Sequence, residues 1–334
     1  MRPNTDGRAP HVTAGLRVWA RIGRVVLPVG LALGLALPLA GSGVAGAASA
    51  PQVPLAGYRL LGGDGGVFAF AAPFVGSAAS DPTTCAAATA ARTMPEGTCW
   101  SMATTPDDRG YWILNAYSGA VTPYGDAVSY GDRTASNVGG ADTWPTSVAL
   151  VATPDGRGYW MLDVGLSGLG TVVPYGDAVS YGDQSTLAAS GGIAGVPVGL
   201  AATPDGRGYW IVDSDGGVFA FGDAAFDGSM GGHTLAADVV GMARTPDGQG
   251  YWLAATDGGV FAFGDATFGG SMAGTRLAAP VTGIAAEEFG GGYWLAASDG
   301  GVFALGGAPF LGSMAGRALA RPVLAISTPS ASPV

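Results

Sequence analysis

The sequence predicts an all-β fold made of small repeated sheets, and three observations support this prediction. The element Gly-Tyr-Trp, written Gly-Tyr-Arg in the first copy, occurs six times, with steps of 53, 48, 50, 42 and 42 residues between copies. Glycine accounts for 59 of the 334 residues and gathers with aspartate and proline in turn-like dipeptides such as Asp-Gly and Gly-Gly. No long amphipathic helical pattern interrupts the body of the chain. Because a repeat of about 42 residues is the size of one four-stranded blade, we predict a six-bladed β-propeller of four-stranded blades.

The clearest copy predicts four strands separated by tight turns. The expected strands are four apolar or alternating runs, at 239–246, 251–256, 260–264 and 268–272. Asp-Gly pairs interrupt these runs and favour tight turns, because glycine tolerates positive φ and aspartate forms hydrogen bonds with its own backbone. A small sheet with two apolar faces needs neighbours on both sides, and repeated units supply them. The six first strands are expected to begin near Cys99, Thr146, Val196, Asp238, Pro280 and Pro322.

The two ends of the repeat region contain complementary parts of one repeat. The first copy enters at the second strand, GYRLLGGDGGVFAF, whereas the last copy is followed by an isolated first strand at 322–328. We therefore expect the C-terminal strand to complete the first blade and close the ring, which leaves no open end. A right-handed β-solenoid is the alternative architecture, but its coils are shorter and it does not explain the divided unit.

The N-terminal segment has the layout of a signal peptide. Arginines at 17, 21 and 24 precede an apolar stretch at 25–40 and the small residues Ala45-Gly46-Ala47. We expect residues 1–47 to be a signal peptide, 48–54 a short linker, 55–328 the propeller and 329–334 a flexible tail, with an uncleaved membrane anchor as the alternative for the first segment. The expected location is secreted or extracellular, with cell-wall association.

Charge and cysteine content limit the partners and the chemistry. The chain has a formal net charge of −10, lacks lysine, and becomes more acidic once the basic leader is removed. Such a chain repels phosphate backbones and anionic lipids, so we expect neither nucleic-acid binding nor direct membrane binding. In an exported protein, Cys85 and Cys99 are expected to form a disulfide within one insertion. We expect no metal and no cofactor, because no phosphate-binding glycine motif or dense ligand set is present.

The repeat resembles one found in exported proteins of high-GC Gram-positive bacteria. The resemblance rests on the motif DGGVFAFGDAxFxGSM followed by TPDGRGYW, and it covers residues 55–328. That family is predicted to form β-propellers and is sometimes attached to hydrolase or cell-wall amidase domains. The blade pattern is also similar to RCC1-like and WD-type repeats, although the Gly-His and Trp-Asp dipeptides of WD-type repeats are missing. The resemblance implies an architecture and leaves the activity open.

Most recurring side chains are interpreted as scaffold. The aspartates that recur at three turns in successive copies are expected to form those turns, with calcium ligation as the alternative. The tryptophans of the Gly-Tyr-Trp element are expected to pack between blades, with a sugar-stacking ring as the alternative. Glu287 and Glu288, which replace a Pro-Asp-Gly turn, are interpreted as a solvated loop. The sequence offers no reason for Arg59 in the tryptophan series.

The variable loops on this scaffold are the candidate binding surface. They place His233, Arg276 and Arg317 in similar regions of three copies, and Trp144 is an aromatic residue outside the repeat pattern. No catalytic residue is singled out, so the leading hypothesis is a secreted, non-enzymatic module that binds a cell-surface glycan or protein through these loops. The alternatives are a glycoside hydrolase or lyase with carboxylates in the central channel, and a structural spacer.

Overall fold

The computed structural model describes residues 57–79, 100–116, 118–134, 146–165, 167–187, 193–289 and 291–329. All of them belong to one compact unit of the chain, Val53–Val334. The predicted signal peptide, the linker, the residues of the tail beyond 329, the Cys85–Cys99 pair and Trp144 lie outside the described residues.

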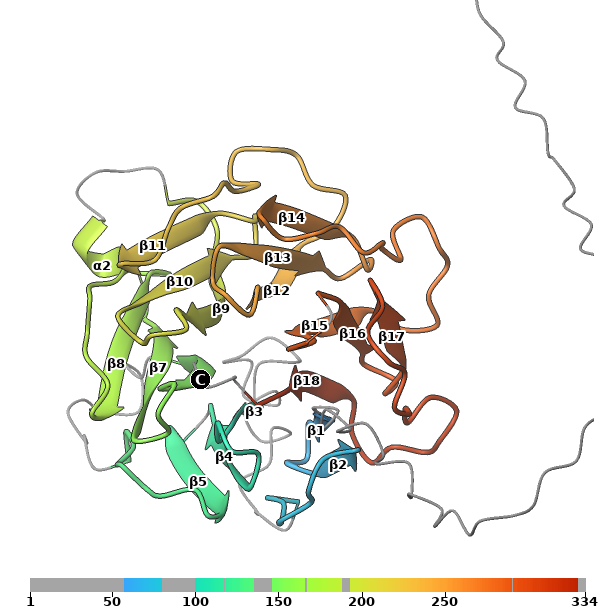
Figure 1. The fold of residues 1–334 in the computed structure, drawn as a ribbon, viewed down its shortest axis with the longest axis horizontal. Helices are drawn as coiled ribbons and strands as arrows, with labels where there is room; N and C mark the ends of the chain where they lie inside the picture. Colours follow the sequence, from blue (N-terminus) through green and yellow to red (C-terminus); the bar gives the residue numbers. More distant parts are fainter. Residues whose placement is uncertain are drawn as a thin grey trace, which may run out of the picture. The chain divides into compact units, whose positions relative to one another are not determined.

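The all-β prediction is confirmed, and the strands form six antiparallel sheets of three strands each. Figure 1 shows these sheets placed around a common centre, with one strand of each sheet nearest to it. The inner strands are β3 (Trp100–Thr104), β6 (Thr146–Ala152), β9 (Pro197–Ala202), β12 (Val239–Arg244), β15 (Val281–Ala286) and β18 (Val323–Ser327). Each begins at the residue that the sequence indicated or one position later.

The remaining strands follow the inner ones outward. The middle strands are β1 (Tyr58–Gly62), β4 (Gly110–Asn115), β7 (Gly158–Val164), β10 (Gly208–Asp213), β13 (Gly250–Ala255) and β16 (Tyr293–Ala297). The outer strands are β2 (Val67–Phe70), β5 (Ala120–Gly125), β8 (Gly170–Gly176), β11 (Val218–Gly222), β14 (Val260–Gly264) and β17 (Val302–Leu305). Among the described residues, a short helix, α2 (Gln184–Leu187), follows β8. Within the described part of the chain, no helix is both long and apolar enough to cross a bilayer.

One sheet combines strands from both ends of the described chain, in the order β18-β1-β2. The register pairs Arg59 with Ser327 and Leu60 with Ile326. Each inner strand contacts the inner strands of two other sheets, in the cycle β3, β6, β9, β12, β15, β18 and back to β3. The neighbouring sheets therefore cover each other's apolar faces, which is the burial that the repeat pattern requires.

The predicted fourth strand is wrong, because 268–272 and its counterparts form no ladder. Gly270 has a φ of +116°, which departs from an extended backbone. Its carbonyl accepts a hydrogen bond from the Tyr293 hydroxyl of the next sheet at 2.6 Å, while the Met272 N–H bonds the Gly258 carbonyl at 2.8 Å. The backbone groups of this segment thus bind a side chain and a turn instead of a fourth strand.

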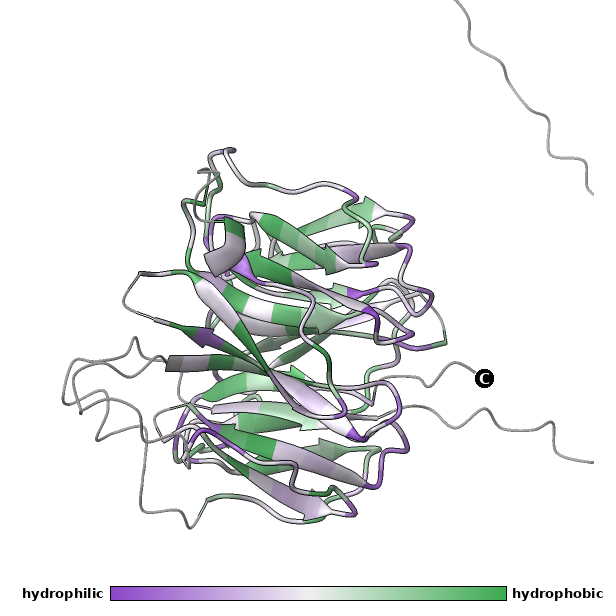
Figure 2. Cartoon of the chain, turned by 90° about the vertical axis from the view of Figure 1, so that its left-hand side faces the viewer, coloured by the Kyte–Doolittle hydropathy of each residue, from purple (hydrophilic) through white to green (hydrophobic). Residues whose placement is uncertain are grey.

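The core lies between adjacent sheets and is built from the middle strands. Trp210 packs against Tyr251 of the next sheet with ring centroids 5.8 Å apart, and both side chains are completely buried. Related tryptophan–tyrosine pairs join four further junctions at 5.2–5.8 Å. The structure confirms that the tryptophans pack between sheets. In Figure 2 the strands carry most of the hydrophobic colour and the turns at their ends most of the hydrophilic colour.

The recurring aspartates form turns, as the sequence indicated. In the turn between β9 and β10, the Asp205 carboxylate accepts hydrogen bonds from the Thr203 hydroxyl at 2.9 Å and the Arg207 N–H at 3.1 Å. Gly206 in this turn has a φ of +71°, which few other residues adopt. The Thr203 hydroxyl also joins the Gly208 backbone, which ends the inner strand at Ala202.

Candidate functional site

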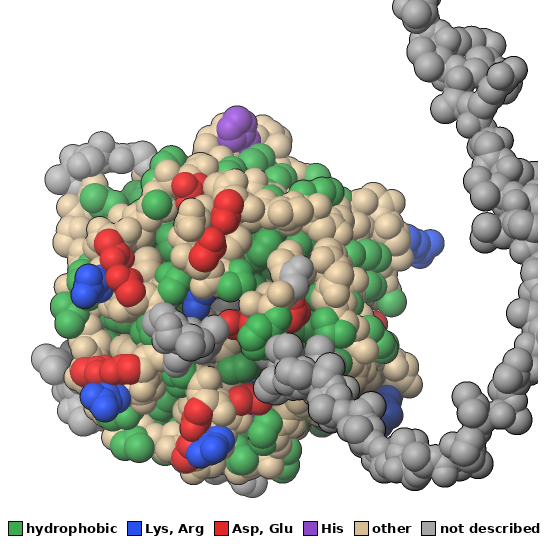
Figure 3. All heavy atoms as spheres, in the orientation of Figure 1, with side chains coloured by type: hydrophobic (Ala, Val, Ile, Leu, Met, Phe, Trp, Pro, Cys, Tyr) green, Lys and Arg blue, Asp and Glu red, His purple; other side chains and the backbone are tan. Residues whose placement is uncertain are grey.

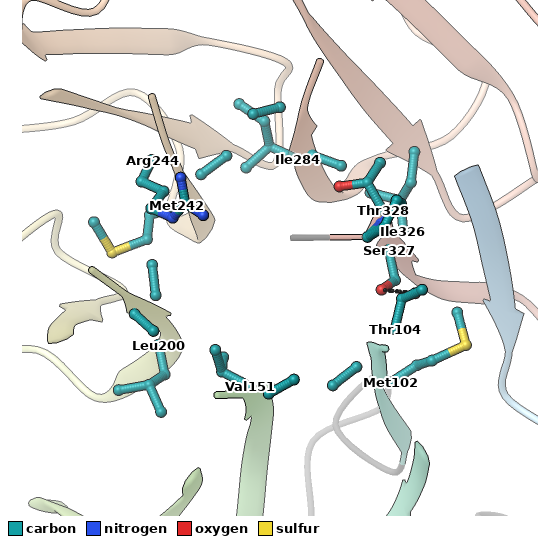
Figure 4. Close-up of a pocket in the computed structure, with 18 of the residues that line it drawn as sticks. Met102, Thr104, Val151, Leu200, Met242, Arg244, Ile284, Ile326, Ser327 and Thr328 are labelled. Carbon is teal, nitrogen blue, oxygen red and sulfur yellow. Dashed lines mark hydrogen bonds between the residues drawn. The ribbon is translucent and has the colours of Figure 1, made fainter. Parts of the chain in front are cut away.

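The inner strands of all six sheets line a central cavity of about 200 Å³. Its wall has polar and apolar surface in about equal parts, and Leu200, Met242 and Ile284 are among the apolar lining residues (Figure 4). The Thr104 and Ser327 hydroxyl oxygens lie 2.9 Å apart in a hydrogen bond that joins β3 to β18. The cavity therefore combines apolar side chains with polar groups, as ligand sites do, although it is smaller than most.

Arg244 is the cation among the described residues that line this cavity. It ends β12, at a position that pairs with the first tyrosine of β13. Its Nη1 donates hydrogen bonds to the backbone carbonyls of Thr245 at 3.0 Å and Pro246 at 2.9 Å, which hold the guanidinium in place. Burial lowers the pKa of Arg244, although the nearby carboxylates of Glu288 and Asp247 raise it. The guanidinium is thus a partly desolvated positive charge at the cavity wall.

Glu288 is the carboxylate among the described cavity-lining residues, and it interacts electrostatically with Arg244. The interpretation of Glu287 and Glu288 as a solvated loop is wrong. Glu287 is only 5% exposed, and its N–H bonds the Gly292 carbonyl at 2.8 Å, as the turn threonines of other sheets do. Glu288 therefore takes the place of a turn proline, which directs its side chain toward the cavity.

Sequence reasoning missed Arg244 and interpreted Glu288 only as part of a loop, although the sequence contains the signal. A position-by-position comparison of the repeats shows Thr104, Ala152, Ala202 and Ala286 where β12 has Arg244. Two neighbouring sheets thus depart from the repeat close to the point where the inner strand meets its turn. The alternative hypothesis of a glycosidase needs two carboxyl groups across a substrate, and this cavity supplies one among its described lining residues.

The loop residues that the sequence singled out lie apart. His233, Arg276 and Arg317 are exposed and belong to three loops, which follow β11, β14 and β17. The His233 and Arg317 N–H groups make the same turn hydrogen bond, to the carbonyls of Met230 and Met314. The structure places these side chains on three different sheets and brings none of them to the central cavity.

Each of four successive sheets has a pair of aspartates at the turn between its inner and middle strands and the end of its outer strand. In one of these pairs, Asp205 and Asp223 share a hydrogen bond, and the pKa of Asp223 is raised by burial and by Asp205. The pKa of Asp205 is lowered, because hydrogen bonds from Arg207 and Thr203 outweigh its burial. The Arg207 Nε lies 3.8 Å from Asp205, and Figure 3 shows acidic and basic side chains side by side on this face. The other pairs are Asp107–Asp126, Asp155–Asp177 and Asp247–Asp265.

These pairs do not amount to a metal centre. Across the described ranges, no group of three or more His, Cys, Asp or Glu side chains is placed to hold a metal ion.

A second buried acid, Asp213, ends β10 and is completely buried. Its Oδ1 accepts a hydrogen bond from the Gln184 Nε2 at 2.7 Å, whereas its Oδ2 has no hydrogen-bond partner among the described residues. Burial, together with the nearby Asp215 charge, raises the pKa of Asp213 to about 6, although the hydrogen bond from Gln184 lowers it. Gln184 also accepts the Gly170 N–H at 2.8 Å, so this side chain links α2 to two sheets.

The structure explains Arg59, which the sequence did not. In five sheets the tryptophan Nε1 bonds a backbone carbonyl beyond the outer strand, for example Trp252 to Thr267 at 2.9 Å. The Arg59 Nε makes the equivalent bond to Pro73 at 3.0 Å. Its Nη1 binds Asp108 at 2.6 Å, and Asp108, with a φ of +62°, stands where other turns have glycine. An arginine–aspartate pair thus replaces a tryptophan–glycine pair between the β1 and β3 sheets.

Four phenylalanines form an exposed row, one on each of four sheets. Phe74, Phe226, Phe268 and Phe310 follow the outer strands at equivalent positions and are 58–62% exposed. The other two sheets have serines at this position, each one residue after an exposed valine, Val128 or Val179. Isolated exposed hydrophobic residues are ordinary, but these recur at one position of the repeat.

Comparisons with known proteins give no family. No protein-family model matches the chain, and no curated protein matches it. Among solved structures, the chain is similar to the β-propeller domain of Cps50 (Swd1) from Myceliophteria thermophila, with a TM-score of 0.41 and 10% sequence identity. The similarity covers 65% of this chain and 72% of that one.

Proposed function

We propose that the chain is a six-bladed β-propeller of three-stranded blades, closed by β18, which works as a non-catalytic binding module. We further propose that residues 1–47 direct its export and that its partner lies at the cell envelope. The sequence-based hypothesis left a glycan and a protein open as partners, and a glycan is the partner argued here. The antiparallel pairing of β18 with β1 and the cyclic contacts of the inner strands support the closed arrangement.

The row of exposed phenylalanines, defined by Phe74, Phe226, Phe268 and Phe310, is the observation that carries this proposal. Each of these residues exposes more than half of its surface. A polymer of sugar rings presents repeated apolar faces that can pack on successive aromatic rings. The acidic charge of the chain, −10 overall, disfavours strongly anionic polymers, so a neutral or amine-bearing glycan fits best.

The loop residues His233, Arg276 and Arg317 give this proposal a second contact region. They are exposed on the three sheets that carry Phe226, Phe268 and Phe310. Variable polar residues beside repeated aromatic ones would provide selectivity, while the aromatic contacts provide most of the affinity.

Retention on insoluble glycan tests the proposal. The purified full chain is mixed with cell-wall glycan from a high-GC Gram-positive bacterium, with chitin and with cellulose, and the bound fraction is measured after sedimentation. The variant Phe226→Ser, Phe268→Ser, Phe310→Ser should lose retention. The matched control Arg109→Gln, Arg157→Gln, Arg207→Gln changes three exposed residues on other turns and should keep it.

Two results would contradict the glycan proposal. One is the absence of retention on every glycan, and the other is equal retention by the phenylalanine variant and the unchanged chain. A protein partner would instead appear as retention on envelope preparations that is lost after protease treatment.

A further inference from the structure

We propose that the central cavity is a second binding site, and that it holds a small amphiphilic monocarboxylate whose carboxylate group contacts Arg244. This site is separate from the exposed phenylalanines, so the inference goes beyond the proposed glycan binding and does not depend on it.

The first argument is that the repeat has no structural need for Arg244. The equivalent positions of four other sheets carry threonine or alanine, and in three of these sheets the turn that follows makes the same threonine hydrogen bonds. Arg244 also carries the cost of removing a guanidinium in part from water, because its side chain is partly buried. Arg244 is thus an energetically unfavourable side chain that the other copies of the repeat lack, which indicates a role in binding.

The second argument comes from the hydrogen bonds of the guanidinium. Arginine has five N–H donors in a planar fork. Nη1 directs its donors to the carbonyls of Thr245 and Pro246, which fixes the plane of the group. Within the described part of the chain, Nε and Nη2 make no hydrogen bond, so their donors are available to Glu288 and to a ligand. A carboxylate is the anion whose two oxygens match this fork.

The third argument is the apolar surface next to this charge. Leu200, Met242 and Ile284 line the cavity beside Arg244. These three side chains suit the hydrocarbon part of a ligand whose charged end reaches Arg244.

The size of the cavity and the charge of Glu288 restrict the ligand further. A volume of about 200 Å³ corresponds to roughly six or seven water molecules in liquid water, so the ligand is small. Glu288 repels a second negative charge, so the site should prefer a monocarboxylate to a dicarboxylate of the same length. The carboxylate of Glu288 also weakens binding of any anion, and its neutralisation should strengthen it.

Calorimetric titration of the full chain with hexanoate tests the proposal, and 1-hexanol, hexylamine and adipate serve as matched ligands. We expect saturable binding of hexanoate and at least about tenfold weaker binding of the other three. Arg244→Ala should reduce hexanoate affinity by roughly tenfold or more. Glu288→Gln should increase hexanoate affinity and reduce the preference over adipate. Arg207→Ala, an exposed arginine outside this cavity, should leave both unchanged.

The two variants are expected to change hexanoate affinity in opposite directions, so the test still decides the question if one variant is unstable. A damaged fold weakens binding, so tighter binding by Glu288→Gln supports the site even if Arg244→Ala does not fold. In that case Arg244→Lys is measured instead, because it keeps the positive charge and removes the planar guanidinium group. The proposal is wrong if the folded chain does not bind hexanoate saturably, if Arg244→Ala or Arg244→Lys binds it equally well, or if Glu288→Gln weakens binding. The phenylalanine variant should bind hexanoate normally, which separates this site from the glycan surface.

Discussion

Replacing Asp213 by asparagine should remove a large part of the pH dependence of folding. The carboxyl group is completely buried, and its pKa in the folded chain is about 6, compared with an ordinary value of 3.8. Asparagine has nearly the same shape, keeps an oxygen for the Gln184 Nε2, and carries no charge. The change therefore isolates the cost of ionising this one group.

The sign and size follow from the difference between the two pKa values. Because the folded pKa is raised, Asp213 favours folding most below about pH 4, and this advantage is lost as the pH rises through about 6. A difference of about two units is equivalent to about 3 kcal/mol in the free energy of unfolding between those limits. Above pH 7 the ionised, completely buried carboxylate destabilises the native chain by that order of magnitude.

Urea unfolding at a series of pH values from 4 to 8 measures this effect. The unchanged chain should lose stability across the series, whereas Asp213→Asn should show a flatter profile and be the more stable protein at pH 8. At pH 4 the amide is expected to be equal or slightly less stable, because its NH₂ group replaces Oδ2, which lacks a partner among the described residues. Asp257→Asn, at a partly exposed turn, controls for the loss of one charge. Parallel profiles for the unchanged chain and Asp213→Asn would refute the reasoning.

Three further predictions concern the contacts between sheets. Arg59→Ala should lower the free energy of unfolding in urea by about 3–5 kcal/mol, because it leaves Asp108 without its buried partner. The double change Arg59→Trp, Asp108→Gly should recover most of this loss, and no recovery would mean that the arginine–aspartate and tryptophan–glycine pairs are not equivalent. Deleting the chain from Val323 onward should abolish cooperative thermal unfolding by exposing β1, and an unchanged melting temperature would contradict the assigned pairing. Tyr251→Phe, which removes the hydroxyl bonded to the Gly228 carbonyl at 2.6 Å, should cost about 1 kcal/mol, and an unaltered midpoint in urea would show that water replaces the bond.

The sequence predicted the strands well where local pattern and burial agree. The inner strands begin where alternating apolar runs begin, and the turn aspartates bond the backbone as their spacing implied. The predicted fourth strand failed because 268–272 has strand-like composition, while Gly270 takes a positive φ and its carbonyl binds Tyr293 from another repeat. That partner lies outside the segment, so local pattern reasoning did not reveal it.

The site was less predictable than the fold. The candidate residues His233, Arg276 and Arg317 were chosen because their loops vary between repeats. Variation among loops does not show whether their side chains lie close together in the folded chain. Arg244 and Glu288 come together because two neighbouring sheets place their inner-strand ends at one cavity. Finding them from the sequence requires comparing equivalent positions across repeats and taking the departures, instead of the recurrences, as the signal.

The sheet β18-β1-β2 sets an order of events during synthesis. The hairpin of β1 and β2 leaves the ribosome before the other described strands, and its third strand, β18, leaves after all of them. At ordinary translation rates this delay is on the order of ten seconds or more. Leu60 and Leu61 in β1, which are completely buried in the finished protein, stay uncovered throughout that interval. The chain therefore has a built-in period of vulnerability to aggregation and proteolysis, and a chaperone that holds the nascent hairpin would raise the yield of native protein.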